Sequence, residues 1–334
     1  MDLPSASLFF YIPSIYDGSR LECRIYLPRE FTNTESAVSW PNRGAIIAHP
    51  YAPLGGCFDD PVVGFIGGEL LDAGCIVGTF NFRGAGDSEG RTSWTAKPEL
   101  GDYVSFYGFM LQYLHFLKLT LAPRDQGASD ACISTDKEGN LPDIHLILGG
   151  YSYGSLMASH VPTLDTMLNF FDPTSSSTTR STPRSKIRDM AKRIAAASLE
   201  RLQLSHTVAD ALKLRAWPTS ISYLLVSPLL PPISQFLTMF STLSLDIKTE
   251  NPQSSHIPCP HPADQQRSNP VLALFGDQDN FTSAGKLQKW SEDMTHKPDS
   301  QFQFRKIEGA GHFWCEDGVE AQARRALKEW IRQM

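Results

Sequence analysis

The sequence predicts an α/β fold in which a mostly parallel central sheet carries helices on both faces. Segments with helical character alternate with short apolar runs, and this order is typical of a doubly wound sheet. The runs do not alternate between apolar and polar residues, as expected for strands that are covered on both sides. They are GAIIAH (44–49), CIVGTF (75–80), HLILGG (145–150), SYLLVS (222–227) and VLALFG (271–276).

The first forty residues predict a different element, an antiparallel hairpin. Residues 8–12 and 21–27 are β-prone and are separated by the turn-rich sequence YDGSR. Further along the chain, residues 302–307 read as the last strand of the sheet. Helices are expected at 65–73, 100–119, 155–162, 283–295 and 316–334.

Several stretches interrupt this order. Residues 123–143 are expected to form a surface loop, 174–183 are of low complexity, and 251–269 read as an excursion loop rich in Pro, Ser and His. Residues 186–204 carry apolar side chains at helical spacing. This helix is either an ordinary packed surface helix or part of a lid formed by an insertion at 165–215. We expect one domain over 1–334 that contains this insertion.

Composition excludes several classes of function. The 334 residues carry a formal net charge of −6, which argues against a nucleic-acid partner. The six cysteines are scattered and have neither C-x-x-C nor metal-ligand spacing, so we expect no metal and no cofactor. No window reaches the length of a membrane span and no targeting signal is evident, so we expect a cytoplasmic protein. The oligomeric state stays open.

The motif Gly150-Tyr151-Ser152-Tyr153-Gly154 is the strongest chemical signal. It follows the strand HLILG directly and precedes the helix-like segment SLMASH. A serine at such a strand-to-helix turn needs small residues two positions away on each side, because the backbones are crowded. The free N–H groups of the helix that starts there favour developing negative charge. Ser152 is therefore the candidate nucleophile, although the motif alone also occurs by chance.

A serine hydroxyl needs a base, and the base needs an orienting group. In this architecture the partners follow in the order Ser, Asp or Glu, His. Asp279 follows the strand 271–276 and is the preferred acid. Asp277 is the alternative, although an Asp at its position more commonly bonds the turn backbone. His312 follows the glycine-rich turn after the last strand and is the candidate base.

An oxyanion needs backbone N–H donors. One is expected from Tyr153, the residue after the nucleophile. The other is expected from the loop His49-Pro50-Tyr51-Ala52, which follows the strand 44–49. Pro50 has no N–H group, so Tyr51 is the expected donor and Ala52 the alternative. An ordinary glycine-rich turn is the competing interpretation of this loop.

Five motifs together resemble the α/β-hydrolase superfamily, most closely its dienelactone-hydrolase-like or prolyl-oligopeptidase-like branch, which includes many uncharacterised fungal members. They are HPYAPLGG, NFRGAGDSEG (81–90), GYSYG, GDQD and GAGHFW, in the order typical of that superfamily. The resemblance covers about 44–160 and 220–334. It implies a structural role for Arg83, Gly84, Gly86 and Ser88 in the loop after the fourth strand. Their spacing does not complete G-x-G-x-x-G, so we do not expect NAD binding.

These residues predict a serine hydrolase that forms an acyl-enzyme on Ser152, of the carboxylic-ester or thioester type. Its expected partner is a small acyl substrate: an apolar or aromatic ester, thioester or lactone. Two alternatives remain open: a lyase, cyclase or acyltransferase that uses the same pocket, for example in secondary metabolism, and a non-catalytic binding protein on this fold. The candidate substrate-binding residues are aromatic, namely Phe58, Trp94, Tyr151, Phe281, Phe313 and Trp314.

Overall fold

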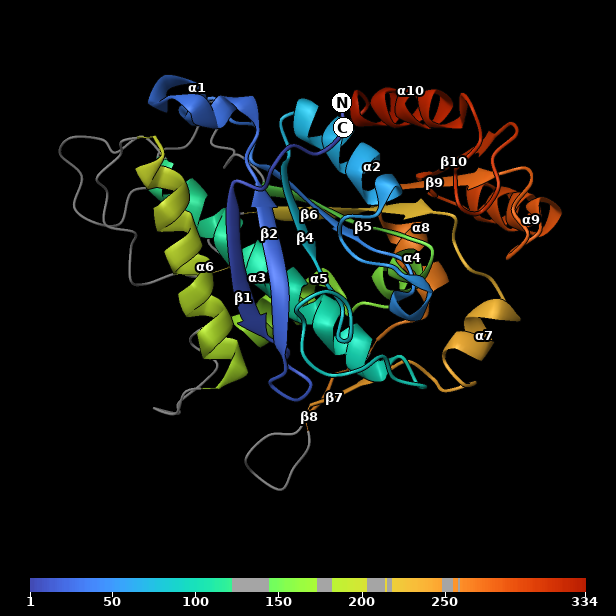
Figure 1. Cartoon of the computed structure of the whole chain (residues 1–334), viewed down its shortest axis with the longest axis horizontal. Coiled ribbons are helices and arrows are strands. Elements are labelled where there is room, and N and C mark those ends of the chain that lie inside the picture. Colours follow the sequence, from blue (N-terminus) through green and yellow to red (C-terminus); the bar gives the residue numbers. More distant parts are fainter. Residues whose placement is uncertain (122–143, 173–181, 203–213, 215–217, 248–254, 258) are drawn as a thin grey trace.

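A central sheet of eight strands organises the part of the chain that the computed structural model describes (Figure 1). The described residues are all except 122–143, 173–181, 203–213, 215–217, 248–254 and 258. In spatial order the strands are β1 (Leu8–Pro13), β2 (Arg20–Tyr26), β4 (Ile76–Phe80), β3 (Arg43–Ala48), β5 (Ile144–Tyr151), β6 (Thr219–Val226), β9 (Val271–Gly276) and β10 (Phe302–Ile307).

The sheet combines an antiparallel edge with a parallel body. β1 and β2 form the predicted hairpin, in which Leu8 pairs with Ile25, and β2 also pairs antiparallel with β4. From β4 to β10 all neighbouring strands are parallel. Every residue of β4 and of β9 is buried. This confirms why those runs are apolar without alternation: helices cover both sides of these strands.

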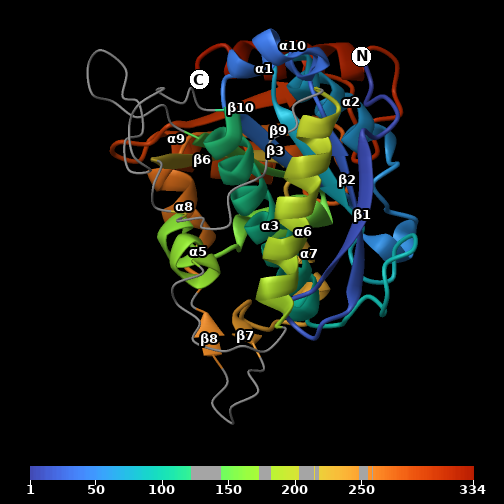
Figure 2. The same ribbon diagram turned by 90° about the vertical axis from the view of Figure 1, so that its left-hand side faces the viewer.

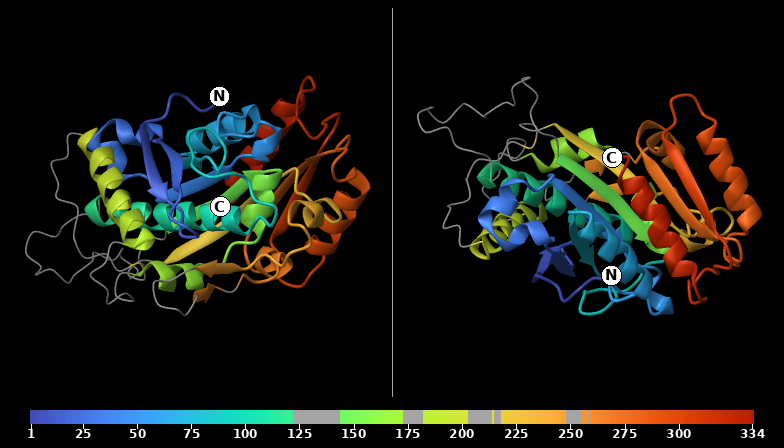
Figure 3. Two further views of the ribbon diagram at one scale, coloured as in Figure 1. Left: turned by 60° about the horizontal axis from the view of Figure 1, so that its bottom comes forward. Right: turned by 90° about the horizontal axis from the view of Figure 1, so that it is seen from above.

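Helices form a layer on each face of the sheet (Figures 1 and 3). Side chains of α2 (Pro61–Asp72) and α10 (Val319–Ile331) share one apolar core with the sheet. The larger core on the opposite face takes side chains from α3 (Lys97–Leu121), α4 (Tyr153–Ser159), α5 (Leu164–Phe171), α6 (Pro183–Glu200), α8 (Pro262–Ser268) and α9 (Ala284–Thr295). Among the helices of the described part of the chain, none combines the length and the apolar character that a membrane span needs.

Short elements complete the described chain. They are η1 (Arg29–Thr32), α1 (Thr34–Val38), η2 (Ala52–Leu54), α7 (Ile233–Leu237), β7 (Leu245–Ile247) and β8 (Ser255–Ile257). β7 and β8 pair as a separate two-stranded sheet. The excursion loop predicted at 251–269 is therefore wrong in part, because this stretch contains β8 and α8. The predicted loop at 123–143 lies entirely outside the described residues, and so does most of 174–183.

Local capping explains why two helices begin earlier than expected. α2 begins at Pro61, where the Asp60 side chain accepts a hydrogen bond from the Val62 N–H group. α6 begins at Pro183, where Thr182 Oγ1 accepts from the Ser185 N–H group. A proline at the first helical position costs no hydrogen bond, because the N–H group there has no partner within the helix. Both helices can therefore begin at a proline, several residues before the first position that the spacing of apolar residues indicates.

The loop after β4 is built around a buried arginine. The Arg83 guanidinium donates to Asp102 on α3 at 2.7 Å and to Asp17 at 2.9 Å. Gly84 and Gly86 have φ values of +77° and +51°, in the left-handed region that glycine adopts without a steric penalty. These contacts tie the loop to α3 and to the β1–β2 turn, as expected for a structural segment.

Candidate active site

Ser152 lies at a strained turn between β5 and α4. Its φ of 54° and ψ of −111° are unusual for a residue with a side chain, and such strain is maintained only where the surrounding structure enforces it. The Ser152 N–H group donates to the Val226 carbonyl oxygen at 2.8 Å. A Cβ atom on Gly150 would overlap the Gly154 backbone, and one on Gly154 would overlap the Ala48 carbonyl oxygen. Both glycines of the motif are therefore required by close backbone approach.

Three side chains from distant parts of the sequence meet at the carboxyl edge of the sheet. Ser152 Oγ lies 2.9 Å from His312 Nε2, and His312 Nδ1 lies 2.8 Å from Asp279 Oδ2. All three residues are buried. Asp279 follows β9 and His312 follows β10, so the neighbouring parallel strands deliver acid and base to the same edge.

The two candidate acids make different contacts. Asp279 Oδ1 accepts hydrogen bonds from the N–H groups of Phe281 at 2.8 Å and Thr282 at 3.1 Å, which leaves Oδ2 for the imidazole. Asp277 Oδ1 instead accepts from the Gly309 N–H group at 2.8 Å. Asp277 therefore bonds the turn before His312, while Asp279 bonds the ring itself.

Two aromatic residues hold His312 in place. The rings of Phe281 and His312 are stacked, with centroids 4.1 Å apart and planes inclined by 22°. The Tyr151 hydroxyl donates to the His312 carbonyl oxygen at 2.7 Å. Burial raises the pKa of Tyr151, so this hydroxyl stays protonated and remains a donor. Ring packing and the backbone contact both restrict the orientation of the imidazole.

The two expected oxyanion donors follow paired residues of two neighbouring strands. Ala48 on β3 pairs with Gly150 on β5, and Tyr51 and Tyr153 each follow three residues later. Within the described part of the chain neither N–H group has an acceptor. The Tyr51 and Tyr153 rings pack together with centroids 5.1 Å apart.

A buried histidine shapes the loop that carries Tyr51. His49 Nδ1 lies 2.6 Å from the Pro50 carbonyl oxygen, and its Nε2 accepts from the Phe82 N–H group at 2.9 Å. Burial lowers the pKa of His49 to about 4, so the ring is neutral near pH 7, with the proton on Nδ1. His49 therefore links the loop after β3 to the end of β4.

A cavity of about 340 Å³ opens onto Ser152 and His312; we call it the Ser152 pocket. Three of the six predicted aromatic residues line it, namely Tyr151, Phe281 and Phe313. The other lining residues are Pro50, Tyr51, Leu54, Gly55, Gly56, Asp60, Leu229, Ile233, Phe236 and Leu237. The walls are thus mainly apolar. Among the described lining residues, Asp60 is the only one of the charged types Asp, Glu, Lys and Arg.

The prediction was wrong for the other three aromatic residues. Phe58 is buried beneath the Arg24 guanidinium, 3.6 Å from its ring centroid. Trp94 is 79% exposed and does not line the pocket. Trp314 is buried in the core shared with α2 and α10, and its Nε1 donates to Ser227 Oγ at 2.9 Å. Sequence proximity to the motifs does not determine the direction of a side chain in a loop.

The sequence did not lead us to expect that α7 forms one wall of the Ser152 pocket. Ile233, Phe236 and Leu237 line the Ser152 pocket, together with Leu229. The signal was present: the stretch LLPPISQFL follows the carboxyl end of β6, the edge at which open α/β sheets bind ligands.

The described helices of the 165–215 insertion do not line the Ser152 pocket. α6 lies alongside α3 and β1 (Figure 2), and its Ile187, Ala191 and Ala195 are buried in the larger core. The Tyr113 hydroxyl on α3 forms a 2.8 Å hydrogen bond with Ser198 Oγ on α6. α6 is therefore a packed helix rather than a lid. Residues 173–181, 203–213 and 215 of the insertion lie outside the described residues.

The described residues contain no group of three or more His, Cys, Asp or Glu side chains placed to hold a metal ion. A serine is hydrogen-bonded to an imidazole, the imidazole is hydrogen-bonded to a buried carboxylate, and free backbone donors lie at the same edge. This is the arrangement that activates a hydroxyl for attack on an acyl carbon.

Comparison with solved structures identifies the fold. One α/β serine hydrolase without a lid, from Xanthomonas campestris, matches with a TM-score of 0.50 and 15% identity, over 100% of this chain and 97% of that chain. A protein of unknown function from Agrobacterium tumefaciens matches with a TM-score of 0.50 and 16% identity, over 98% and 96% of the two chains. The sequence matches no protein-family model and no curated protein. The predicted α/β-hydrolase fold is confirmed.

Proposed function

We propose that this α/β-hydrolase-fold chain is a serine hydrolase that cleaves an apolar or aromatic ester, thioester or lactone through an acyl-enzyme on Ser152. The observation that carries the proposal is the continuous pair of hydrogen bonds from Ser152 through His312 to Asp279. An assignment to the dienelactone-hydrolase-like or prolyl-oligopeptidase-like branch stays a prediction from the sequence motifs.

The proposed reaction has two halves. Ser152 Oγ attacks the acyl carbon while His312 Nε2 takes its proton, and Asp279 stabilises the imidazolium that forms. The N–H groups of Tyr51 and Tyr153 receive the negative charge on the carbonyl oxygen. His312 then protonates the leaving alcohol or thiol. In the second half His312 takes a proton from a water molecule, which attacks the acyl carbon. His312 then returns this proton to Ser152 Oγ as the acyl–oxygen bond breaks, which releases the acid and the free serine.

The character of the pocket supports an uncharged substrate. Aliphatic and aromatic side chains dominate its walls, so apolar groups of a substrate gain from burial there. Asp60 lines the same pocket, and burial raises its pKa because the carboxylate is partly removed from water. A second anionic group in the pocket would be repelled by this carboxylate. We therefore infer neutral esters rather than dicarboxylate monoesters as substrates.

The test is hydrolysis of p-nitrophenyl acetate, butyrate, dodecanoate and benzoate by the purified chain. The proposal predicts measurable turnover and a kcat/KM that rises with the apolar character of the acyl group. Indifference to acyl hydrophobicity would contradict the proposed substrate class. Replacement Ser152→Ala should abolish turnover. Ser291→Ala is the matched control, because Ser291 is a buried serine on α9 whose hydroxyl has no partner among the described residues.

The same variant separates the hydrolase from the non-hydrolytic alternative. A lyase or cyclase that uses His312 and Asp279 as a simple base does not need the Ser152 hydroxyl. If a reaction of this chain survives Ser152→Ala, the acyl-enzyme route is wrong for that reaction. An acyltransferase would lose activity in the variant, and it is distinguished by transfer of the acyl group to an added alcohol in place of water.

A further inference from the structure

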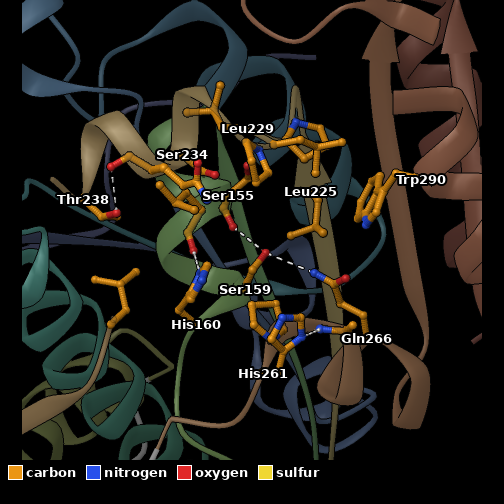
Figure 4. A pocket seen from close by; sticks show the side chains of 18 of the residues that line it. Ser155, Ser159, His160, Leu225, Leu229, Ser234, Thr238, His261, Gln266 and Trp290 are labelled. Atoms are coloured by element: carbon orange, nitrogen blue, oxygen red, sulfur yellow. Dashed lines mark hydrogen bonds between the residues drawn. The ribbon is translucent and has the colours of Figure 1, made fainter. Parts of the chain in front are cut away.

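A second cavity, of about 800 Å³, lies next to the Ser152 pocket. Its walls come from the carboxyl end of β6 and from α4, α7, α8 and α9. Figure 4 shows these lining residues: Ser155 and Ser159 of α4 near the middle of the view, Leu229 and Ser234 above them, and His160 and His261 below. This cavity is more than twice as large as the Ser152 pocket.

The lining of the second cavity is mostly apolar and has no buried charge. Among the described lining residues, two belong to the charged types Asp, Glu, Lys and Arg: Asp293, which is exposed, and Lys297, which is half-buried. The apolar lining residues include Leu225, Leu229, Leu230, Trp290 and Met294. Such a cavity favours an apolar group and disfavours a charged one, because burial of an unpaired charge is costly.

Neutral hydrogen-bonding groups lie within this apolar wall. Gln266 Nε2 donates to Ser159 Oγ at 3.3 Å, and Ser159 Oγ donates to the Ser155 carbonyl oxygen at 2.8 Å (Figure 4). His160 Nδ1 lies 2.8 Å from the Leu156 carbonyl oxygen, and burial lowers the pKa of this ring. His160 is thus neutral at pH 7, and with its proton on Nδ1 it keeps Nε2 as an acceptor. A hydroxyl group of a ligand can therefore donate a hydrogen bond to this neutral nitrogen, and neither partner is charged.

Leu229 and α7 contribute to both cavities and form the wall between them. Leu229 lines both cavities. Ile233, Phe236 and Leu237 line the Ser152 pocket. Residues Ser234, Gln235 and Thr238, on the other side of the same turn, line the second cavity.

This wall is weakly held. α7 has five residues, and none of them is buried. So short a helix is not stable by itself and depends on its neighbours. Its anchors are at its ends, where the Leu230 N–H group donates to Thr282 Oγ1 at 3.2 Å and Thr238 is buried. Segments with few buried contacts open at low free energy, so the wall can move to admit a ligand.

We propose that the two cavities are compartments of one substrate site, and that the substrate carries an elongated, uncharged and mostly apolar chain that passes Leu229 into the second cavity. The inference rests on the proposed function, because the reacting ester group lies at Ser152. It adds a substrate class to that function: esters with a long chain, which bears a neutral hydroxyl group far from the ester. Leu229 is then the residue that sets the accessible chain length.

Two series of esters test the inference and show which side of the ester is elongated. The first series lengthens the acyl group, from p-nitrophenyl acetate to p-nitrophenyl dodecanoate. The second lengthens the alcohol, from ethyl acetate to dodecyl acetate. The measured quantity is the ratio of kcat/KM for the long ester to that for the short ester. This ratio cancels effects on the chemical step that both esters share.

Three variants are compared with the unmodified chain. Ser234→Phe fills the second cavity from α7 and should lower the ratio about tenfold, which corresponds to the loss of two buried methylene groups. Leu229→Ala removes the shared side chain and should raise the ratio several-fold. Ser268→Phe is the matched control: the same change on α8, at an exposed serine that lines neither cavity, should leave the ratio unchanged.

The outcomes separate the two proposals. If short esters are hydrolysed but the ratio is the same in Ser234→Phe, Leu229→Ala and the unmodified chain in both series, the inference is overturned and the proposed function stands. If no ester is hydrolysed, both are overturned. If Ser234→Phe does not fold, as judged by thermal unfolding, Leu229→Ala decides: an increased ratio supports the shared site, and an unchanged ratio overturns it.

Discussion

The Tyr151 hydroxyl donates a 2.7 Å hydrogen bond to the carbonyl oxygen of His312, 161 residues further along the chain. This contact joins the turn that carries the proposed nucleophile to the loop that carries the proposed base. Phe281 also restrains the proposed base, because its ring stacks against the His312 ring. The distance between Ser152 and His312 is therefore fixed by contacts that are not themselves part of the reaction.

Tyr151→Phe should lower both stability and kcat. The change leaves the buried His312 carbonyl oxygen without its donor, which costs about 1–3 kcal/mol. The ring remains, so KM for a short ester should change less than kcat. The matched control is Tyr223→Phe, because the buried Tyr223 hydroxyl has no partner among the described residues. Urea unfolding should separate the two variants; equal stability would contradict the role of the Tyr151 contact.

The two aspartates after β9 should differ sharply when each is changed to Asn. Asp279→Asn removes the carboxylate that orients His312 and should lower kcat about 10⁴-fold, as an amide favours the wrong imidazole tautomer. Asp277→Asn keeps an oxygen acceptor for the Gly309 N–H group and should lower kcat less than about tenfold. Steady-state kinetics on p-nitrophenyl butyrate measures both. A reversed order would make Asp277 the functional acid.

Gly154→Ala should destabilise the chain by about 3 kcal/mol, because the added methyl group meets the Ala48 carbonyl oxygen and cannot be accommodated without backbone movement. Gly64→Ala is the control within α2, where a Cβ atom meets nothing within 4 Å. It should stabilise the chain by roughly 0.5–1 kcal/mol through lower backbone entropy of the unfolded state. Thermal unfolding of both variants tests the tight turn; similar effects would contradict it.

Because His49 is buried and neutral, we expect the folded chain to lose stability in acid. Burial lowers its pKa from 6.5 to about 4, so below 6.5 the unfolded chain binds more protons than the folded one. Stability therefore falls as the pH drops from 6.5 towards 4, by about 2 kcal/mol from this residue between about pH 7 and pH 5. The variant His49→Gln should lose less stability over that interval when unfolding is measured by urea titration.

The acid effect should decrease in His49→Gln without disappearing. Burial also lowers the pKa values of His115 and His145 to about 4, and both remain in the variant. The comparison is therefore between two slopes of unfolding free energy against pH. Identical slopes for the variant and the unmodified chain would show that His49 does not titrate as its burial implies.

The sheet was predictable because its strands are covered on both sides and so carry apolar runs without alternation. The edge at which Ser152, Asp279 and His312 meet followed from the same logic, since parallel strands end together. The turn geometry at Ser152 was predictable because only glycine tolerates the close approach at positions 150 and 154.

The pocket walls were not predictable in the same way. Trp94 and Trp314 both lie in loops next to motifs, yet one is exposed to solvent and the other is buried in the core. In loops the direction of a side chain depends on tertiary contacts, such as the Trp314 hydrogen bond to Ser227, and not on a repeating period. α7 was missed for a related reason: a five-residue helix is too short to show helical periodicity.

The most direct test of the account is labelling with a fluorophosphonate probe, followed by intact mass measurement and peptide mapping. The account predicts one adduct, on the peptide that contains Ser152, none on that peptide in Ser152→Ala, and much slower labelling in His312→Ala. If the folded chain takes up no probe, or carries it on another residue while Ser152 stays unmodified, Ser152 is not an activated nucleophile and the proposed hydrolase is wrong.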